Sequence, residues 1–355
     1  MPVYYAFFKR GVDILKMEQE NSNSSKVISD YKCVVCGEAE MEYVLHVPNV
    51  NFSKKITQFD IIRCKHCGLA SMYPFPKKED IEEIYNTENV FSKDISDTTN
   101  KKKWGASFFE PAYARYGTYY HYIAKKCVNL SGKRPEDLRI LDVGCSTGRL
   151  LKEFNRIVPK ADIQGIEIDP DAKNKAFNEV KDRITIGNFL EQEYKDKFDI
   201  ITFCFVVEHL PNVDDYIKKA EKLLNEDGIL FYSSPDIGSR KALQLKSKWR
   251  LINDPINKHG HVIWFNKKSA CYLANKNNLE VVHYKNRGEF IYQLPIFLQK
   301  AMKFLFGSVQ SPNGEVRVIK NYQLRMMYAL LFDALLPEIF SWGDSFYLFA
   351  KKKPQ

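Results

Sequence analysis

The alternation of strand-like and helix-like segments after residue 138 constrains the fold of this chain most strongly. Six short apolar runs fit β-strands, at 138–143, 162–168, 183–186, 198–205, 228–233 and 279–284. Helical spacing of apolar residues fills four gaps between them, at 147–157, 170–180, 214–224 and 266–277. Strands that take turns with helices predict an α/β fold with a doubly wound, mostly parallel sheet. A seventh strand is expected at 345–350.

Composition indicates a globular protein and limits the classes of partner that it can be expected to bind. The chain has 355 residues, of which 45% are apolar and 14% aromatic, and this excludes disordered and fibrous classes. The net charge of +9 is mild, and basic residues cluster only at 101–103 and 351–353, so nucleic acid is not expected as a partner. No apolar run reaches the roughly 18 residues of a membrane span. We therefore expect no transmembrane segment and a cytoplasmic location, while the oligomeric state is left open.

A glycine-rich turn, DVGCSTG (142–148), joins the first of these strands to its helix. Glycine has no Cβ atom, so the backbone can approach a ligand and present its N–H groups at the helix start. The phosphate-binding loop is disfavoured because its lysine is missing. The dinucleotide fingerprint is disfavoured because Ser146 and Arg149 replace two of its glycines. Asp142 suits a ligand with an ammonium group, and Glu167 ends the next strand where a ribose diol would lie.

Five segments in order resemble the motifs of class I S-adenosylmethionine-dependent methyltransferases: LDVGCSTGRL (141–150), GIEIDP (165–170), GNFLE (187–191), FDIITFCFVVEHLPNVDDYI (198–217) and LLNEDGILFYSSPD (223–236). The resemblance implies a Rossmann-like fold with S-adenosyl-L-methionine as cofactor. It also implies that the methionine part is surrounded by Asp142, Gly144, Cys145, Ser146 and Gly148. Glu167 would bind the ribose, Ile168 would pack on adenine, and Asn188 with Phe189 would face the adenine edge. The alternative is a turn and core positions in a sheet without this ligand.

Two cysteine pairs near the N-terminus have the same form, CVVCG (33–37) and CKHCG (64–68). Each pair puts two thiolates on a tight turn, and four thiolates in a tetrahedral array suit a structural Zn²⁺ ion. We therefore expect zinc to be bound by Cys33, Cys36, Cys64 and Cys67. The alternative is four reduced, free cysteines. A zinc-ribbon-like module before this fold resembles zinc-binding methyltransferases that modify sugars, nucleotide sugars and cell-surface glycan precursors.

The composition along the chain predicts four parts. They are a tail or linker at 1–30, a zinc-binding module at 31–76, a helical linker and lid at 77–135, and a methyltransferase domain at 136–355. A helical insertion at 285–344 is expected before the last strand. Its apolar stretch 290–306 fits core or lid packing, and the alternative is a surface for peripheral contact with a lipid-linked substrate or a membrane.

Candidates for a catalytic base follow the fourth and fifth strands. Glu208 and His209 come after the strand at 198–205, at the edge where open sheets bind ligands. Phe205 occupies the first Glu position of the metal-binding E-x-x-E-H motif of some relatives, so no catalytic metal is expected. The segment HGHVIWF (259–265) is similar to the E-H-x-x-Y-F segment of sugar methyltransferases, with glycine in place of the glutamate. We hypothesise that His261 is the general base; alternatively, these histidines cap a helix or bond to the backbone.

The function predicted from these patterns is methyl transfer from S-adenosyl-L-methionine to a hydroxyl, or to a carbon, of a small-molecule or glycan substrate. One alternative is an RNA base methyltransferase whose zinc module binds RNA, although no Asn-Pro-Pro-Tyr-like motif follows the fourth strand. Another alternative is a non-catalytic scaffold that only binds the cofactor.

Overall fold

The computed structural model describes residues 28, 31–50, 52–53, 55–86, 119–253, 260–288, 294–299, 308–310, 316–318 and 343–354. Lys32–Gln355 form one compact unit, which holds every element named below. The predicted tail, apart from residue 28, and most of the predicted insertion, including 290–293 and 300–306 of its apolar stretch, lie outside the described residues. So does 87–118 of the predicted linker. None of the described helices combines the length and the hydropathy of a membrane span.

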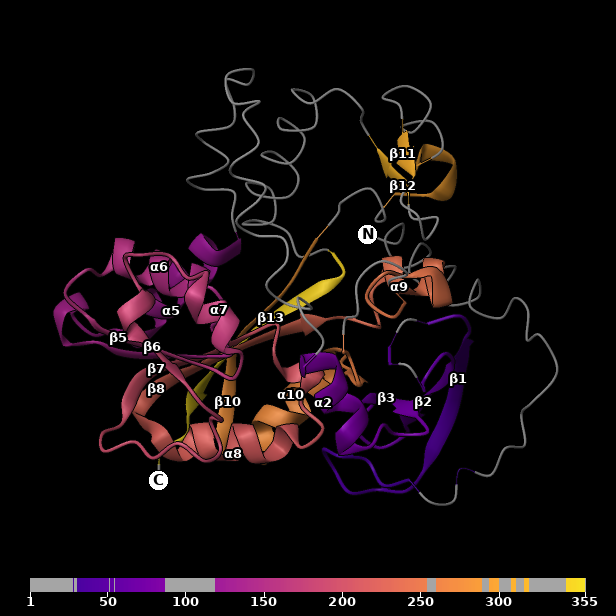
Figure 1. Ribbon diagram of the computed structural model, residues 1–355, viewed down its shortest axis with the longest axis horizontal. Helices are drawn as coiled ribbons and strands as arrows, with labels where there is room; N and C mark the ends of the chain where they lie inside the picture. The colour runs from indigo at the N-terminus through magenta and orange to yellow at the C-terminus, as the bar shows by residue number, and fades with distance from the viewer. Residues whose placement is uncertain are drawn as a thin grey trace, which may run out of the picture. The chain divides into compact units, whose positions relative to one another are not determined.

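Seven strands form the main sheet, as the alternation predicts (Figure 1). In spatial order they are β10 (Leu279–Arg287), β13 (Ser345–Lys352), β8 (Leu224–Pro235), β7 (Phe198–Cys204), β4 (Arg139–Val143), β5 (Asp162–Glu167) and β6 (Ile184–Ile186). The strands from β8 to β6 pair in parallel, and β13 runs antiparallel to both of its neighbours. The chain order reverses between β4 and β7. Ligands of open sheets bind at the carboxyl edge beside such a reversal.

Helices cover both faces of this sheet. On one face, α5 (Tyr119–Ser131) and α6 (Arg149–Ile157) bury Ile123 and Phe154. On the other, α8 (Val213–Leu223) and α10 (Lys267–Lys276) bury Ile217 and Leu273. Further helices among the described residues include α2 (Lys78–Asn86), α9 (Arg240–Leu245) and the short 3₁₀ turns η2 (Pro135–Asp137), η3 (Lys181–Arg183), η4 (Val207–His209) and η5 (Lys246–Lys248).

Helix α7 (Pro170–Asn174) is shorter than the segment 170–180 that the sequence predicts. It begins as expected, because the side chain of Asp169 accepts a hydrogen bond from the amide of Asp171 and Pro170 takes the first helical position. The amide of Phe177 then donates to the carbonyl of Thr147, 3.2 Å away, rather than continuing the helix. The segment after α7 is thereby bonded to the glycine-rich turn.

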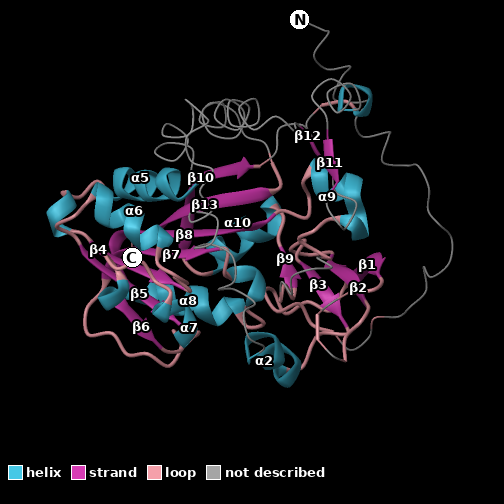
Figure 2. Ribbon diagram, turned by 45° about the horizontal axis from the view of Figure 1, so that its top comes forward, coloured by secondary structure: helices cyan, strands magenta, loops and turns pink. Residues whose placement is uncertain are grey.

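A second, smaller sheet contains β1 (Met41–Val47), β2 (Phe59–Cys64) and β3 (Ala70–Tyr73), all antiparallel. Its fourth strand is β9 (Ile263–Trp264), which comes from a distant part of the chain and pairs with β3 (Figure 2). The sequence predicts the module at 31–76 but not this shared strand. A short hairpin of β11 (Ser308–Gln310) and β12 (Val316–Val318) completes the described elements.

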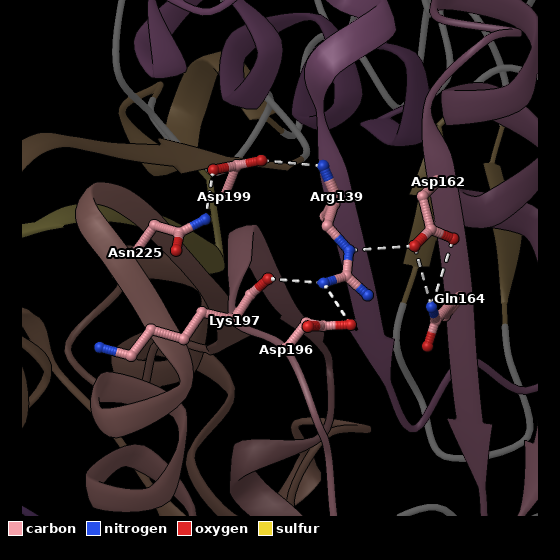
Figure 3. A network of polar contacts seen from close by, with 7 residues as sticks. All are labelled: Arg139, Asp162, Gln164, Asp196, Lys197, Asp199 and Asn225. Carbon is pink, nitrogen blue, oxygen red and sulfur yellow. Dashed lines mark hydrogen bonds and ion pairs between the residues drawn. The ribbon is translucent and has the colours of Figure 1, made fainter.

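A polar network joins the amino ends of four main-sheet strands, β4, β5, β7 and β8 (Figure 3). The guanidinium of Arg139 contacts Asp162 at 3.1 Å and Asp196 at 3.0 Å. Asp199 accepts hydrogen bonds from the amide of Arg139 at 2.9 Å and from the side chain of Asn225 at 2.7 Å. These contacts hold β4, β5, β7 and β8 in register at the end opposite to the predicted site.

Candidate active site and metal centre

The glycine-rich turn after β4 has a backbone that requires glycine at two positions. Gly144 has φ of +68° and Gly148 has φ of +80°, in the left-handed region that other residues rarely adopt. A Cβ atom on Gly144 would lie 2.6 Å from Cγ2 of Val206, and one on Gly148 would lie 2.7 Å from Cγ2 of Val180. The turn therefore packs tightly against the loop after β7, and its amides lie at the start of α6.

The carboxylate of Glu167, at the end of β5, is oriented by the loops around it. Its Oε2 accepts a 2.7 Å hydrogen bond from the amide of Ser146, and its Oε1 accepts from the amides of Ile168 and Asp169 at 2.8 and 3.0 Å. Burial raises the pKa of Glu167. A carboxylate offers about four acceptor positions, so one remains for a ligand hydroxyl. Ile168 beside it is 56% exposed, which suits an apolar surface that a flat ring could cover.

Two further predicted residues, Asp142 and Cys145, belong to the turn and are buried. Asp142 is buried, and its Oδ1 accepts a 2.6 Å hydrogen bond from the hydroxyl of Thr202. Burial raises the pKa of Asp142 to about 7. Cys145 is also buried, and burial raises the pKa of its thiol well above the usual value, so it stays a neutral packing group.

Asn188 and Phe189 follow β6, but their side chains differ in exposure. Oδ1 of Asn188 accepts from the amide of Leu190 at 3.0 Å and from the hydroxyl of Tyr216 at 3.3 Å, so the side chain shapes this turn. The ring of Phe189 is only 2% exposed and stacks on Tyr216 in the core. Only the backbone of Phe189 can therefore face an adenine edge, and that contact stays a prediction.

An aromatic cluster that the sequence did not indicate lies at the carboxyl end of β7. The ring of Phe205 contacts Tyr119 and Tyr347, with centroids 5.6 and 6.3 Å apart, and Tyr119 also contacts Tyr120. These residues come from α5, the end of β7 and β13, so no local pattern joins them. The structure itself marks this position, because Phe205 has φ of +57° although it is not glycine.

The three catalytic candidates come together, two from η4 after β7 and one from the residues just before β9. Nε2 of His261 lies 4.0 Å from Oε1 of Glu208, and the rings of His209 and His261 have centroids 4.7 Å apart. Glu208 and His261 are both buried. Nδ1 of His261 lies 2.8 Å from the carbonyl oxygen of Leu251. Since a carbonyl only accepts, Nδ1 carries the proton and Nε2 carries the lone pair.

Glu208 and His261 together combine a buried carboxyl with an imidazole nitrogen that can accept a proton. Burial raises the pKa of Glu208 to about 8, and its Oε2 has no hydrogen-bond partner within the part of the chain that the structure describes. Donor atoms of Glu208, His209 and His261 also lie within 4.8 Å of one another, the spacing of a divalent-cation site. Phe205 removes the first carboxylate of the E-x-x-E-H motif, but His261 brings a third donor to Glu208 and His209.

The four predicted cysteines of the N-terminal module converge. Sγ of Cys33 lies 3.5 Å from that of Cys67, Sγ of Cys36 lies 3.4 Å from that of Cys64, and all four lie within 4.8 Å. Zinc with four thiolates at 2.3 Å has sulfur–sulfur edges of about 3.8 Å, so the set fits this ion. The thiol of Cys67 stabilises the thiolate of Cys33 and lowers its pKa to about 5.

Comparison with known proteins identifies the domain type. Residues 113–284 match a family described as "Methyltransferase domain". A ubiquinone biosynthesis O-methyltransferase from Glaesserella parasuis is 33% identical over 137 residues, which cover 36% of this chain and 55% of that protein. One from Pelagibacter ubique is 27% identical over 163 residues, which cover 43% and 66%. The chain thus spans between about half and two thirds of the length of these curated relatives.

Two solved structures of methyltransferases are similar to this chain at low sequence identity. A methyltransferase from Archaeoglobus fulgidus is 14% identical with a TM-score of 0.41, covering 69% of this chain and all of that one (100%). One from Clostridium acetobutylicum is 12% identical with a TM-score of 0.39, covering 69% and 98%. The family match and the strand order, taken with the motifs, show that the chain carries a methyltransferase domain of the S-adenosylmethionine-dependent class I type.

Proposed function

We propose that this chain transfers a methyl group from S-adenosyl-L-methionine to a ring hydroxyl of a small molecule, with His261 as general base. One observation carries the proposal. The turn after β4 and Glu167 after β5 lie at the same carboxyl edge as Glu208, which follows the neighbouring strand β7. The proposed donor site and the proposed proton acceptor therefore lie at the same edge of the sheet, where the strand order reverses.

The donor side is formed by residues that are already in place. The amides of the turn lie at the start of α6, Asp142 supplies a buried carboxyl, and Glu167 is oriented for a ribose diol. Ile168 offers the apolar surface for adenine. When bound, the cofactor supplies an electrophilic methyl group on a sulfonium. The protein's main task is then to hold the acceptor in line with that methyl group.

The acceptor side is built around the tautomer of His261. The carbonyl of Leu251 holds the proton on Nδ1, so Nε2 can take the proton of a hydroxyl as the oxygen attacks. The imidazolium that forms lies 4.0 Å from Oε1 of Glu208 and favours its ionised form. The proton of the hydroxyl is therefore held on Nε2 of His261, and the ionised form of Glu208 stabilises the resulting positive charge.

Three lines of support favour a ring that bears a hydroxyl. The matched relatives are named as O-methyltransferases of ubiquinone biosynthesis, and the segment around His261 is similar to that of sugar methyltransferases. Tyr119 and Phe205 of the aromatic cluster are half-buried and offer flat apolar surfaces to such a ring. Aryl and sugar hydroxyls are the two acceptor classes to compare.

The test is methyl transfer from labelled donor to a panel of aryl diols, nucleotide sugars and RNA. We expect label in a ring hydroxyl, and we expect His261→Gln to lower kcat about 10²- to 10⁴-fold with donor affinity unchanged. His46→Gln, at an exposed histidine of the small sheet, is the matched control and should retain activity. Normal turnover in His261→Gln would refute the base. Label in RNA, with binding that weakens steeply in salt, would favour the RNA alternative.

A further inference from the structure

The strand that follows His261 belongs to the small sheet. β9 pairs with β3 in register Ala70 to Trp264 and Ser71 to Ile263. The amide of Met72 donates to the carbonyl of Val262, the residue next to His261, at 3.0 Å. The backbone beside the candidate base is therefore an edge of the cysteine-bearing sheet.

The same residue also contacts the loop that carries Glu208. The amide of Val262 donates to the carbonyl of Glu208 at 3.0 Å, while its own carbonyl accepts from Met72. Val262 thus bridges the small sheet and η4 through both of its backbone groups. Past β9 the chain returns to the main sheet, where the amide of Ile237 donates to the carbonyl of Phe265 at 2.9 Å.

The module also reaches the loop that fixes the tautomer of His261. Leu251 accepts from Nδ1 of the imidazole, and two residues later the side chain of Asn253 donates to the carbonyl of Pro48 at 3.2 Å. Pro48 directly follows β1. Both the backbone next to His261 and the loop of its hydrogen-bond acceptor are therefore attached to the small sheet.

One side chain connects this arrangement to the cysteine turn. Nδ2 of Asn266 donates to the carbonyl of Gly68 at 3.0 Å, and Gly68 lies next to Cys67. The amide of Gly68 in turn donates to the carbonyl of Cys64 at 2.9 Å. Oδ1 of Asn266 accepts from the amide of Ser269 and caps α10, so this residue joins the turn to the helix after β9.

We propose that the module at 31–76, which contains the four cysteines and strands β1 to β3, positions His261. This inference rests on the proposed function of His261. A metal ion on the cysteines holds the Cys64–Gly68 turn, the turn holds β3, and β3 holds β9 and thereby the imidazole against Glu208. The donor-binding residues lie on loops after β4 and β5, which do not pair with the small sheet. Loss of the module's order therefore affects the placement of the base and leaves donor binding intact.

A matched pair of variants tests the link without touching the cysteines or the histidines. Asn266→Asp keeps an acceptor for the amide of Ser269, since aspartate is an equally good helix cap, but removes the donor to Gly68. Ser269→Ala is the control, because it weakens the cap and leaves the bond from Asn266 to Gly68. Both are made in the full chain.

Hydrogen exchange gives a readout that does not depend on activity. In Asn266→Asp we expect the amides of Met72 and Val262 to exchange about fivefold to tenfold faster than in the wild type, because one hydrogen bond that supports this pairing is lost. We expect kcat to fall about tenfold through misplacement of the base, with donor affinity measured by calorimetry unchanged. Ser269→Ala should show neither effect. Unchanged exchange and unchanged kcat in Asn266→Asp would overturn the inference.

Removal of the metal by a chelator provides a second test of the same inference. We expect faster exchange at Met72 and Val262 and a shifted imidazole NMR signal of His261, while the donor still binds. An imidazole signal and exchange rates that do not change on metal removal would overturn the inference. If the metal-free chain unfolds, donor binding is lost as well, and Asn266→Asp decides the question. If the wild type transfers no methyl group to any acceptor, the proposed function fails, but exchange and the imidazole signal still report on positioning.

Discussion

The amide of Ser146 donates a 2.7 Å hydrogen bond to Oε2 of Glu167, and this bond joins the turn after β4 to the end of β5. The other carboxylate oxygen accepts from the amides of Ile168 and Asp169. The group proposed to bind the ribose is thus held by its own loops before a ligand arrives. Such preorganisation lowers the entropy lost on binding.

Glu167→Gln should weaken donor binding. Glutamine has one acceptor oxygen in place of two, and its NH₂ group would face an amide that now donates to Glu167. We expect calorimetry to show a loss of about 10- to 100-fold in affinity for both the donor and its demethylated product, as for charged hydrogen bonds. Glu193→Gln, at an exposed position, is the control. Equal affinities in the two variants would contradict the assignment of Glu167.

Donor affinity should rise with pH because of Asp142. Burial raises the pKa of this carboxyl to about 7, so it is partly protonated near neutral pH without ligand. The donor's ammonium group favours the ionised form, and binding therefore releases a proton. We expect affinity to increase between about pH 6 and about pH 8 and to level off above.

Calorimetry in buffers of different ionisation enthalpy measures that proton release directly. Asp142→Asn should bind more weakly and lose the pH dependence. If the wild type binds the donor with the same affinity and releases no proton across this range, donor binding is not coupled to the ionisation of Asp142.

The sequence predicted the main sheet well because its central strands are buried on both faces. A run such as 229–232 of β8 therefore reads as uninterrupted apolar residues. It predicted the cysteine cluster because the two turns repeat one pattern. It could not predict β9, a two-residue strand whose partner β3 lies almost 200 residues earlier. The contact of Tyr119 with Tyr347 is equally non-local, and neither leaves a periodic signal.

Stability should reveal the burial of Glu208. Its pKa in the folded chain is raised to about 8, above the unfolded value, so folding favours the protonated form. This contribution is fully present below the unfolded pKa and is lost as pH rises through about 8. Glu208→Gln stays neutral at every pH. Between about pH 5 and about pH 9, its free energy of unfolding should therefore fall less than that of the wild type.

Urea denaturation at the two ends of that range provides the measurement for Glu208→Gln. Glu280→Gln, at an exposed position on β10, should follow the wild type. Parallel pH dependences in the wild type and Glu208→Gln would mean that Glu208 ionises as it does in water.

Two glycines of the cofactor motifs should respond differently to a single added methyl group. On Gly165, a Cβ would lie 2.7 Å from both Sγ of Cys145 and Cδ1 of Leu151, so Gly165→Ala must displace these side chains, and Cys145 belongs to the turn proposed to bind the donor. We expect a loss of about 1–3 kcal/mol in the free energy of unfolding, as for overpacked cores, together with weaker donor binding. On Gly187 the nearest atom lies 3.8 Å away, so Gly187→Ala should change stability by no more than about 0.5 kcal/mol.

Urea denaturation of both variants checks this difference, and a double variant tests its cause. Cys145→Ala removes the sulfur that Gly165→Ala would meet, so the double variant should regain part of the lost stability. It should not regain all of it, because Leu151 still lies within 2.7 Å of the added methyl group. If Gly165→Ala and Gly187→Ala unfold at the same urea concentration, the close packing of β5 against the turn does not limit the residue at 165.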